Sequence, residues 1–459
     1  MTHEADVLPA FDAAAAQARS WLAALPQHRT AVTDTARLSE VMPDSPIDPA
    51  GTVAQLAEEL AVGIMPSAGP RYFGFVTGGT LPAALGAEVL TAAWDQNTAL
   101  AVMSPALAEL EDVTGRWIIE LLGLPPALSY GFVTGATMAN WTALAAARRY
   151  VLTQVGWDLD EDGLAGGPPI TVLAGAERHS SIDVALRYLG IGRRRLRIVG
   201  VDDQGRIDPE DLKRGLAEVA GPAIVCAQAG NVNTGAIDPM ADICRTAHAV
   251  GAWVHIDAAV GAWLAASPRH RDQLRGWEQA DSWALDAHKG LNTAYDSGIV
   301  LTAHPGHHTE VCRATAPYLP ASTDRRDGSA WTPEGSRRAR ALGVHAALRQ
   351  LGRSGVADLV TRQCDLAQRF AVALADMPGA QVCNQVTANQ VLVRFGADDA
   401  TTDEVIRRIQ AGGVCWMGGT RRAGVAMMRI SVCNWMTGAA DVDMSLAEIE
   451  RCLALSVDR

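Results

Sequence analysis

The fold is decided by the stretch DSWALDAHKG at residues 281–290, in which one lysine, Lys289, follows a short apolar run. An amine reacts with a carbonyl only while part of it is uncharged, which favours a lysine in a partly desolvated pocket near a strand end. The apolar residues 283–285 predict that strand. A lone lysine is more often a solvated cation, so the interpretation of Lys289 depends on the motifs that precede it.

A second apolar run, WVHIDAA at residues 253–259, contains a carboxylate, Asp257, followed by two small residues. If this carboxylate is buried it needs a partner, because an unpaired buried charge is costly. A protonated pyridine nitrogen is such a partner, and the pair would keep the ring able to stabilise a carbanion. Ala259 is small enough for a flat ring to lie against its methyl group. An isolated aspartate at a strand end would instead be expected to cap the next helix.

The run TGAT at residues 134–137 comes before an alanine-rich stretch, residues 141–150, which predicts a helix. Small and hydroxyl residues at a helix start expose N–H groups to an anion, and the helix dipole adds a favourable potential for a phosphate. The same residue types are also ordinary capping residues.

His179 follows another apolar run, residues 170–173. Its imidazole could stack on a cofactor ring, on the face opposite Ala259. A histidine beyond a strand end is otherwise a hydrogen-bonded surface group, so this motif gains its meaning from the others.

Together and in this order, the motifs resemble the group II pyridoxal phosphate-dependent amino acid decarboxylases, from about residue 70 to the C-terminus. The resemblance implies the type I fold, that of aspartate aminotransferase, with pyridoxal 5′-phosphate as cofactor. It implies three catalytic residues: Lys289 forms a Schiff base with the cofactor, Asp257 pairs with the ring nitrogen, and His179 stacks on the ring. The cofactor site that it implies consists of Thr134, Gly135, Ala136, Thr137, His179, Asn231, Asp257, Ala259, His288 and Lys289.

Two departures from the family pattern bear on the chemistry. Asn231 lies in a segment, residues 228–239, that is usually rich in threonine and serine, so the side chain that meets the ring is open. Tyr318 and Leu319 match a pair that precedes a loop tyrosine, which is thought to return a proton to the substrate carbon after carbon dioxide leaves. Residues 320–331 contain no tyrosine, and Gly328 falls near the expected position. His179 or a water could supply the proton instead.

The expected reaction is therefore decarboxylation of an L-amino acid to the amine and carbon dioxide. Two alternatives stay open: decarboxylation coupled to oxidative deamination, which gives an aldehyde, and a carbon–carbon lyase or aldolase on the same cofactor. A catalytically silent relative that acts as a binding protein is disfavoured, because Lys289 and Asp257 are both present.

The substrate contacts follow from the resemblance alone. Family members take part of each active site from the neighbouring subunit, and in this chain Thr98 and Ala99 would supply that part. Phe75 is expected near the pocket. Arg429 could hold a carboxylate through its planar fork, or form a structural ion pair instead. The amino acid itself is not assigned by these residues.

Helical stretches alternate with short apolar runs from residue 137 to about 303, which predicts an α/β fold with a mainly parallel sheet covered by helices. We expect three regions: an N-terminal helical segment, 1–65, that packs on a partner subunit; a large cofactor-binding domain, 66–335; and a smaller α+β domain, 336–459. The N-terminal helices are predicted at residues 13–25 and 52–62. Shared active sites imply a homodimer.

The chain of 459 residues has 39 basic and 51 acidic residues, which argues against a nucleic-acid surface. Its 8 cysteines lack a Cys-x-x-Cys pair, so neither a metal site nor a disulfide framework is predicted. No apolar stretch reaches the roughly 20 residues that span a bilayer, and the N-terminus does not resemble a signal peptide. We therefore expect a cytoplasmic enzyme that has no membrane or nucleic-acid partner.

Overall fold

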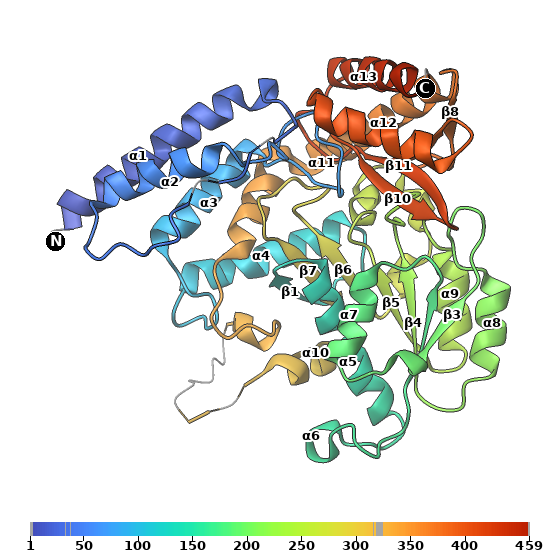
Figure 1. Cartoon of the computed structure of the whole chain (residues 1–459). Coiled ribbons are helices and arrows are strands. Elements are labelled where there is room, and N and C mark those ends of the chain that lie inside the picture. The colour runs from blue at the N-terminus through green and yellow to red at the C-terminus, as the bar shows by residue number, and fades with distance from the viewer. Residues whose placement is uncertain (1–2, 33, 37, 315, 318–324, 458–459) are drawn as a thin grey trace.

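A seven-stranded sheet forms the centre of the chain (Figure 1). The computed structural model describes residues 3–32, 34–36, 38–314, 316–317 and 325–457. The order of the strands in the sheet is β1-β7-β6-β5-β4-β2-β3, and β2 to β6 pair in parallel whereas β7 is antiparallel to both β1 and β6. The strands are β1 (Ser129–Val133), β2 (Thr171–Gly175), β3 (Leu196–Val199), β4 (Ala223–Gln228), β5 (Trp253–Asp257), β6 (Ser282–Asp286) and β7 (Gly298–Thr302).

The predicted mainly parallel sheet is thus confirmed. Every residue of β4, β5, β6 and β7 is buried, which explains why these strands read as nearly continuous apolar runs. Helices lie on both faces of the sheet. Those that pack directly on the strands include α5 (Ala136–Thr153), α8 (Pro209–Ala217) and α9 (Met240–His248). In turn, α6 (Leu159–Asp162), α7 (Ser180–Tyr188) and α10 (Pro305–Cys312) pack on α5.

The C-terminal part forms a second, smaller α+β layer with a core of its own. Its antiparallel sheet has the order β10-β11-β9-β8, and helices cover one face of it (Figure 1). Residues 340–375 form the single helical element α11, which is broken at Gly352, where φ is 61°. The elements are α11 (Arg340–Ala375), β8 (Ala380–Val382), β9 (Gln390–Phe395), α12 (Asp399–Gly412), β10 (Gly418–Arg422), β11 (Val425–Ser431) and α13 (Ala439–Val457).

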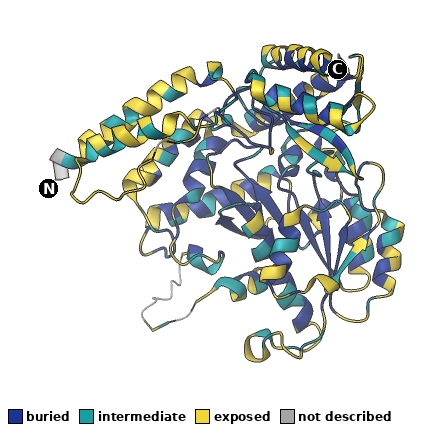
Figure 2. Cartoon of the chain, in the orientation of Figure 1, coloured by how far each residue is buried: buried dark blue, intermediate teal, exposed yellow. Residues whose placement is uncertain are grey.

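The N-terminal helices α1 (His3–Ala24) and α2 (Pro49–Ala61) pack on each other and project from the body, with largely exposed surfaces (Figure 2). Both begin earlier than expected. In α2, Pro49 occupies the first turn and Asp48 accepts a hydrogen bond from the Gly51 N–H at 2.6 Å, an N-terminal cap that the apolar pattern alone does not reveal. The next helices, α3 (Pro82–Trp94) and α4 (Pro105–Leu121), were not predicted, although each also begins with proline.

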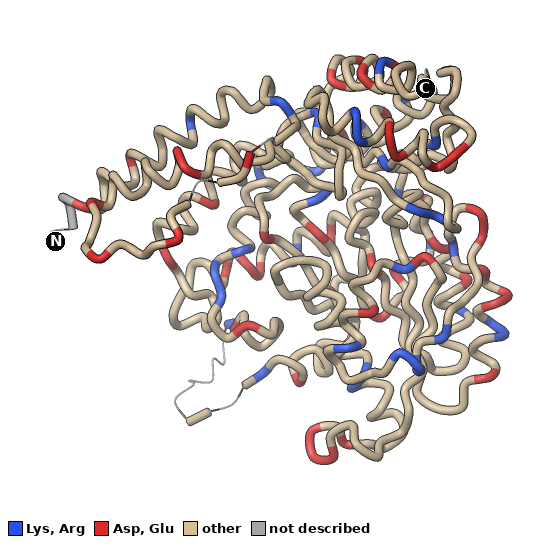
Figure 3. The backbone as a smooth tube through the Cα atoms, in the orientation of Figure 1, with Lys and Arg blue, Asp and Glu red and all other residues tan. Residues whose placement is uncertain are grey.

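Basic and acidic residues are interspersed along the whole chain (Figure 3). Within the described residues, no helix is long and apolar enough to cross a membrane. The cytoplasmic location and the domain limits near residues 65 and 335 stay predictions.

Candidate active site

A cavity of about 270 Å³ opens beyond the carboxyl ends of β4, β5 and β6. Ligands of doubly wound α/β folds bind at this edge of the sheet. The residues that line it are Phe75, Gly135, Ala136, Thr137, His179, Ser181, Gln228, Gly230, Val232, Asp257, Ala259, Val260, Asp286, His288, Lys289 and Tyr295. Most of the predicted cofactor site is therefore brought together here from distant parts of the sequence.

Lys289 follows β6 and extends into this cavity, where its Nζ lies 2.8 Å from Oδ2 of Asp286. Burial lowers the pKa of the Lys289 amine, but the ion pair with Asp286 outweighs burial, so the pKa is raised from its ordinary value. We expected burial to leave part of the amine uncharged. In the protein without its cofactor this expectation is wrong, because the effect of Asp286 on the pKa is larger than that of burial. Asp286 holds the amine protonated.

Asp286 was not assigned a role from the sequence, although it stands three residues before the lysine. Its side chain is buried, and its Oδ1 accepts a hydrogen bond from the Ala136 N–H at 2.7 Å, at the first residue of α5. His288 Nε2 lies 3.5 Å from the same oxygen. The carboxylate thus occupies the helix start at which a phosphate is expected.

Asp257 ends β5 and is 6% exposed. It accepts hydrogen bonds from Asn140 Nδ2 at 3.1 Å, from the Ala259 N–H at 3.2 Å and from Ser181 Oγ at 3.5 Å. In the described part of the chain its donors are all neutral. A buried carboxylate of this kind fits a cationic ring nitrogen, which would supply the missing positive charge.

His179 precedes α7 and caps it, because its Nδ1 accepts a hydrogen bond from the Ser181 N–H at 3.2 Å. Its own N–H donates to Gln228 Oε1 at 3.1 Å, so the residue is fixed at the cavity wall. Ala259 lines the same cavity. The predicted residues Thr134 and Asn231 do not line it: the Asn231 side chain accepts from the N–H groups of the next loop residues and is 1% exposed.

Three of the four predicted substrate residues also lie outside the cavity lining. Thr98 and Ala99 are buried elsewhere, and Thr98 Oγ1 donates to the backbone of Arg338 at 3.2 Å. Arg429 donates to the Val232 carbonyl at 3.1 Å, just behind the cavity wall. Burial lowers the pKa of the Arg429 guanidinium, and no carboxylate among the described residues forms a salt bridge with it. Its alternative role as a structural ion pair is therefore not realised.

Phe75 does line the cavity, and the backbone around it is unusual. Phe75 and Val76 have φ values of 52° and 58°, a left-handed conformation that is costly for bulky and β-branched residues. Sequence reasoning missed Tyr295, whose ring centroid lies 4.3 Å from that of His288 on the same wall. No pattern in the sequence marks Tyr295 as a cavity residue.

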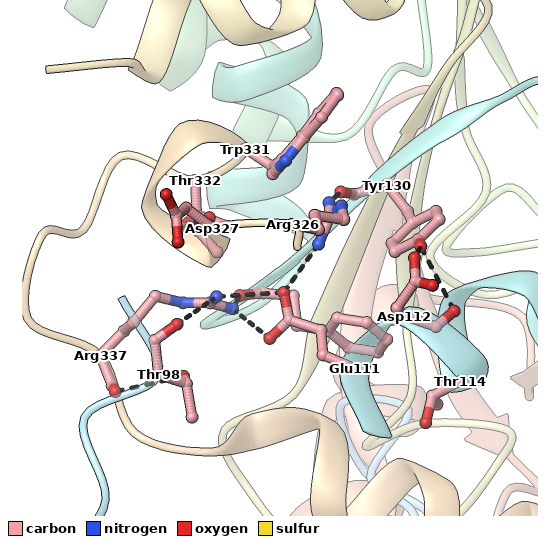
Figure 4. Close-up of polar contacts among 12 residues, drawn as sticks. Thr98, Glu111, Asp112, Thr114, Tyr130, Arg326, Asp327, Trp331, Thr332 and Arg337 are labelled. Carbon is pink, nitrogen blue, oxygen red and sulfur yellow. Dashed lines mark hydrogen bonds and ion pairs between the residues drawn. The ribbon is translucent and has the colours of Figure 1, made fainter. Parts of the chain in front are cut away.

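The segment around Gly328, where the family's loop tyrosine is expected, is anchored by a buried cluster (Figure 4). Arg326 and Arg337 both bind Glu111 at 3.0 Å, and all three side chains are at most 14% exposed. A Cβ on Gly328 would lie 1.8 Å from Arg337 and 2.5 Å from the Thr98 carbonyl. Gly328 therefore packs inside this cluster and not at the cavity, and only glycine fits there. Tyr318, Leu319 and residues 320–324 lie outside the described residues.

One cavity is surrounded by a lysine after β6, a carboxylate at the end of β5 and the start of α5. Pyridoxal phosphate chemistry needs an amine for the aldehyde, an acceptor for the ring nitrogen and a site for the phosphate. Residues 34–396 match the family model described as the pyridoxal-dependent decarboxylase conserved domain. The chain belongs to this family of pyridoxal phosphate-dependent amino acid decarboxylases, which are lyases.

Known relatives act on different amino acids. The chain is 30% identical to the acidic amino acid decarboxylase of Mus musculus, over 65% of this chain and 55% of that protein, and 31% identical to the L-2,4-diaminobutyrate decarboxylase of Rhizobium meliloti, over 68% and 62%. It thus spans less than two thirds of these two relatives. It is 26% identical to phenylacetaldehyde synthase of Petunia hybrida, over 89% and 86%.

The fold is shared with solved structures. A crystal structure of Oryza sativa TDC with PLP and tryptamine matches 99% of both chains with a TM-score of 0.92 at 20% identity. A crystal structure of mouse CSAD matches 96% of this chain and 98% of that one, with a TM-score of 0.89 at 21% identity.

Proposed function

We propose that the protein decarboxylates an L-amino acid to the amine and carbon dioxide, with pyridoxal phosphate bound covalently to Lys289. The observation that supports this proposal most strongly is the convergence of Lys289, Asp257 and the α5 start on one cavity. When bound, the cofactor supplies an electron sink for the carbanion left by carbon dioxide. Asp257 would hold the proton on its ring nitrogen, while His179 and Ala259 would enclose the ring.

We further propose that the substrate side chain is aromatic or bulky and apolar. Phe75, Val232 and Tyr295 form part of the cavity wall, and Lys289 is the one lysine or arginine among its described lining residues. An acidic side chain would need a cation there to offset its desolvation. Arg429 would receive the α-carboxylate from behind Val232, because no carboxylate in the described part of the chain is paired with it.

The test is a panel of amino acids with the reconstituted enzyme, in which carbon dioxide, amine, aldehyde and hydrogen peroxide are followed together. Carbon dioxide with an equal amount of amine, fastest for aromatic substrates, is the expected result. Carbon dioxide with aldehyde and peroxide would favour the second candidate, oxidative deamination, which the similarity to phenylacetaldehyde synthase keeps open. Turnover without carbon dioxide would favour the third candidate, a carbon–carbon lyase or aldolase on the same cofactor.

Two variants test the residue roles. Lys289→Ala should abolish covalent cofactor attachment and nearly all turnover, because no amine remains in the cavity. Asp257→Ala should bind the cofactor but lose most of its rate, because the ring nitrogen loses its partner. Variants with wild-type kinetics would remove these assignments.

We also propose a homodimer in which α1, α2 and α3 meet the partner. These helices expose many large apolar side chains: Val7, Leu8, Phe11, Leu22, Leu56, Leu60, Val89, Leu90 and Trp94. Such a surface is typical of an interface. In this arrangement the loop that contains Thr98 and Ala99 would complete the partner's cavity. Light scattering that gives the mass of two chains is expected, and a monomer with full activity would contradict the shared site.

A further inference from the structure

Alternate residues of β5 share one face of the sheet, and three of them are polar or carry a polar atom. Trp253, His255 and Asp257 point to the same side because strand side chains alternate. All three are buried, and Trp253 and His255 are 0% exposed. The helix α5, which contains the equally buried Asn140, packs against β5, and the neighbouring strand β6 supplies Ser282.

These five residues form a continuous chain of hydrogen bonds. Trp253 Nε1 lies 2.9 Å from Ser282 Oγ, which lies 2.9 Å from His255 Nδ1. The other ring nitrogen, His255 Nε2, lies 2.8 Å from Asn140 Oδ1, and Asn140 Nδ2 lies 3.1 Å from Asp257 Oδ2. The chain therefore ends on the carboxylate proposed to face the cofactor.

The direction of this chain is fixed at its far end. The indole N–H of Trp253 can only donate, so Ser282 Oγ accepts from it. Among the described residues, the other partner of this buried hydroxyl is His255 Nδ1, so the Ser282 proton is satisfied only if it is donated to that nitrogen. Burial lowers the pKa of His255 to about 4, although Asp257 opposes that effect, so the ring is neutral near pH 7. A neutral ring that accepts at Nδ1 donates at Nε2. Asn140 must then accept at Oδ1, and its NH₂ group faces Asp257.

We propose that Trp253, Ser282, His255 and Asn140 form a one-way hydrogen-bond relay that keeps Asp257 an acceptor, and so keeps the cofactor ring nitrogen protonated. They are positioning residues, since none of the four lines the cavity. The inference rests on the proposed role of Asp257. The other titratable groups around Asp257 are Lys289 after β6, Cys226 on β4 and His179 before α7. Lys289 and Cys226 act on Asp257 through space. His179 is connected through Ser181, whose Oγ accepts a second hydrogen bond from Asn140 Nδ2 at 3.0 Å, so this branch meets the relay at its last member.

If the relay acts as proposed, a substitution at its far end should change the pH at which the cofactor ring nitrogen loses its proton. Ser282→Ala removes one hydroxyl, and Trp253 then no longer sets the tautomer of His255. We expect the ring nitrogen to lose its proton at a pH lower by about one unit, the size of one hydrogen bond, and kcat to fall about tenfold with KM unchanged. His255→Phe, which removes the donor to Asn140, should show the same shift or a larger one.

The measurement is the nitrogen chemical shift of holoenzyme reconstituted with pyridine-¹⁵N pyridoxal phosphate, followed against pH. Thr142→Val is the matched control, because Thr142 is buried in α5 but bonds only to Met138. At a pH at which the Ser282→Ala variant has lost the proton on the ring nitrogen, wild type and the Thr142→Val control should still have it. If wild type itself is unprotonated, the role of Asp257 fails and the relay with it. If the ring nitrogen is protonated in wild type, and Ser282→Ala and His255→Phe lose this proton at the same pH as wild type, the relay alone is overturned.

Discussion

The carboxylate of Asp286 lies 2.8 Å from the amine of Lys289 and, through its other oxygen, 2.7 Å from the N–H of Ala136. One side chain thus pairs with the proposed covalent lysine and with the helix start at which the phosphate is expected. Cofactor binding would bring the phosphate dianion toward this carboxylate and would use the amine that is paired with it. We therefore expect Asp286 to slow binding of the cofactor, and we expect its substitution to speed it up.

Asp286→Asn should accelerate covalent attachment of pyridoxal phosphate. The variant removes the ion pair that raises the pKa of Lys289, so the rate profile shifts to lower pH. We expect attachment to be roughly tenfold faster near pH 7, since a unit charge at about 4 Å is worth on the order of 1 to 4 kcal/mol. Stopped-flow absorbance of the apoenzyme mixed with cofactor measures it. Asp365→Asn, which removes the same charge from an exposed pair with Arg269, is the control; equal rates in all three proteins would refute the role of Asp286.

Glu111→Gln should destabilise the fold strongly. The change leaves the buried Arg326 and Arg337 without their carboxylate, which costs about 3–5 kcal/mol. Urea unfolding measures the loss. Glu120→Gln, on the same helix, breaks only an exposed pair with Arg353 and should cost less than about 1 kcal/mol. Similar losses in the two variants would contradict this account of the cluster.

Gly328→Ala should destabilise the protein by about 1–3 kcal/mol, because the added methyl group collides with Arg337 and with the Thr98 carbonyl. Gly335→Ala is the control, since an added Cβ there meets no atom within 4 Å. Thermal unfolding compares the two. For the same steric reason, Gly328→Tyr should not bring a proton donor to the cavity, and a variant that forms amine faster than wild type would disprove this.

Acid should destabilise the fold through His255. Its pKa is about 4 when folded, against about 6.5 when unfolded. Between these values the unfolded chain binds a proton that the folded chain does not, so stability falls as pH falls, by up to about 3 kcal/mol. His255→Phe should remove this part of the pH dependence in urea unfolding. His248, whose pKa is raised by Asp281, acts with the opposite sign, so His248→Gln should not mimic it.

Local patterns predicted the strand that ends at Asp257, the helix after Gly135 and the position of His179 beyond the end of β2, because each depends on neighbours in the sequence. The sequence did not predict that β7 runs antiparallel to β1 and β6, since an apolar run indicates a strand but not its orientation. Three contacts that decide whether a side chain reaches the cavity join distant segments: Asp286 with Ala136, Arg429 with Val232, and Thr98 with the backbone after residue 336. Sequence periodicity contains no information on such pairings.

The residues wrongly placed at the cavity show the same limit. Asn231 was chosen from a family segment, but its side chain closes its own turn, and the neighbours Gly230 and Val232 face the cavity instead. A one-residue shift within a loop reverses which side chain points inward. Only the folded backbone decides it.

The central claim, that Lys289 binds the cofactor, can be tested directly because the chain contains only one other lysine, the exposed Lys213 on α8. The holoenzyme is reduced with borohydride, digested and analysed by peptide mass spectrometry. We predict a pyridoxyl adduct on the peptide that contains Lys289, with one adduct per chain and none on Lys213. Adducts on Lys213 alone, or equal labelling of both lysines in the native enzyme, would contradict the account.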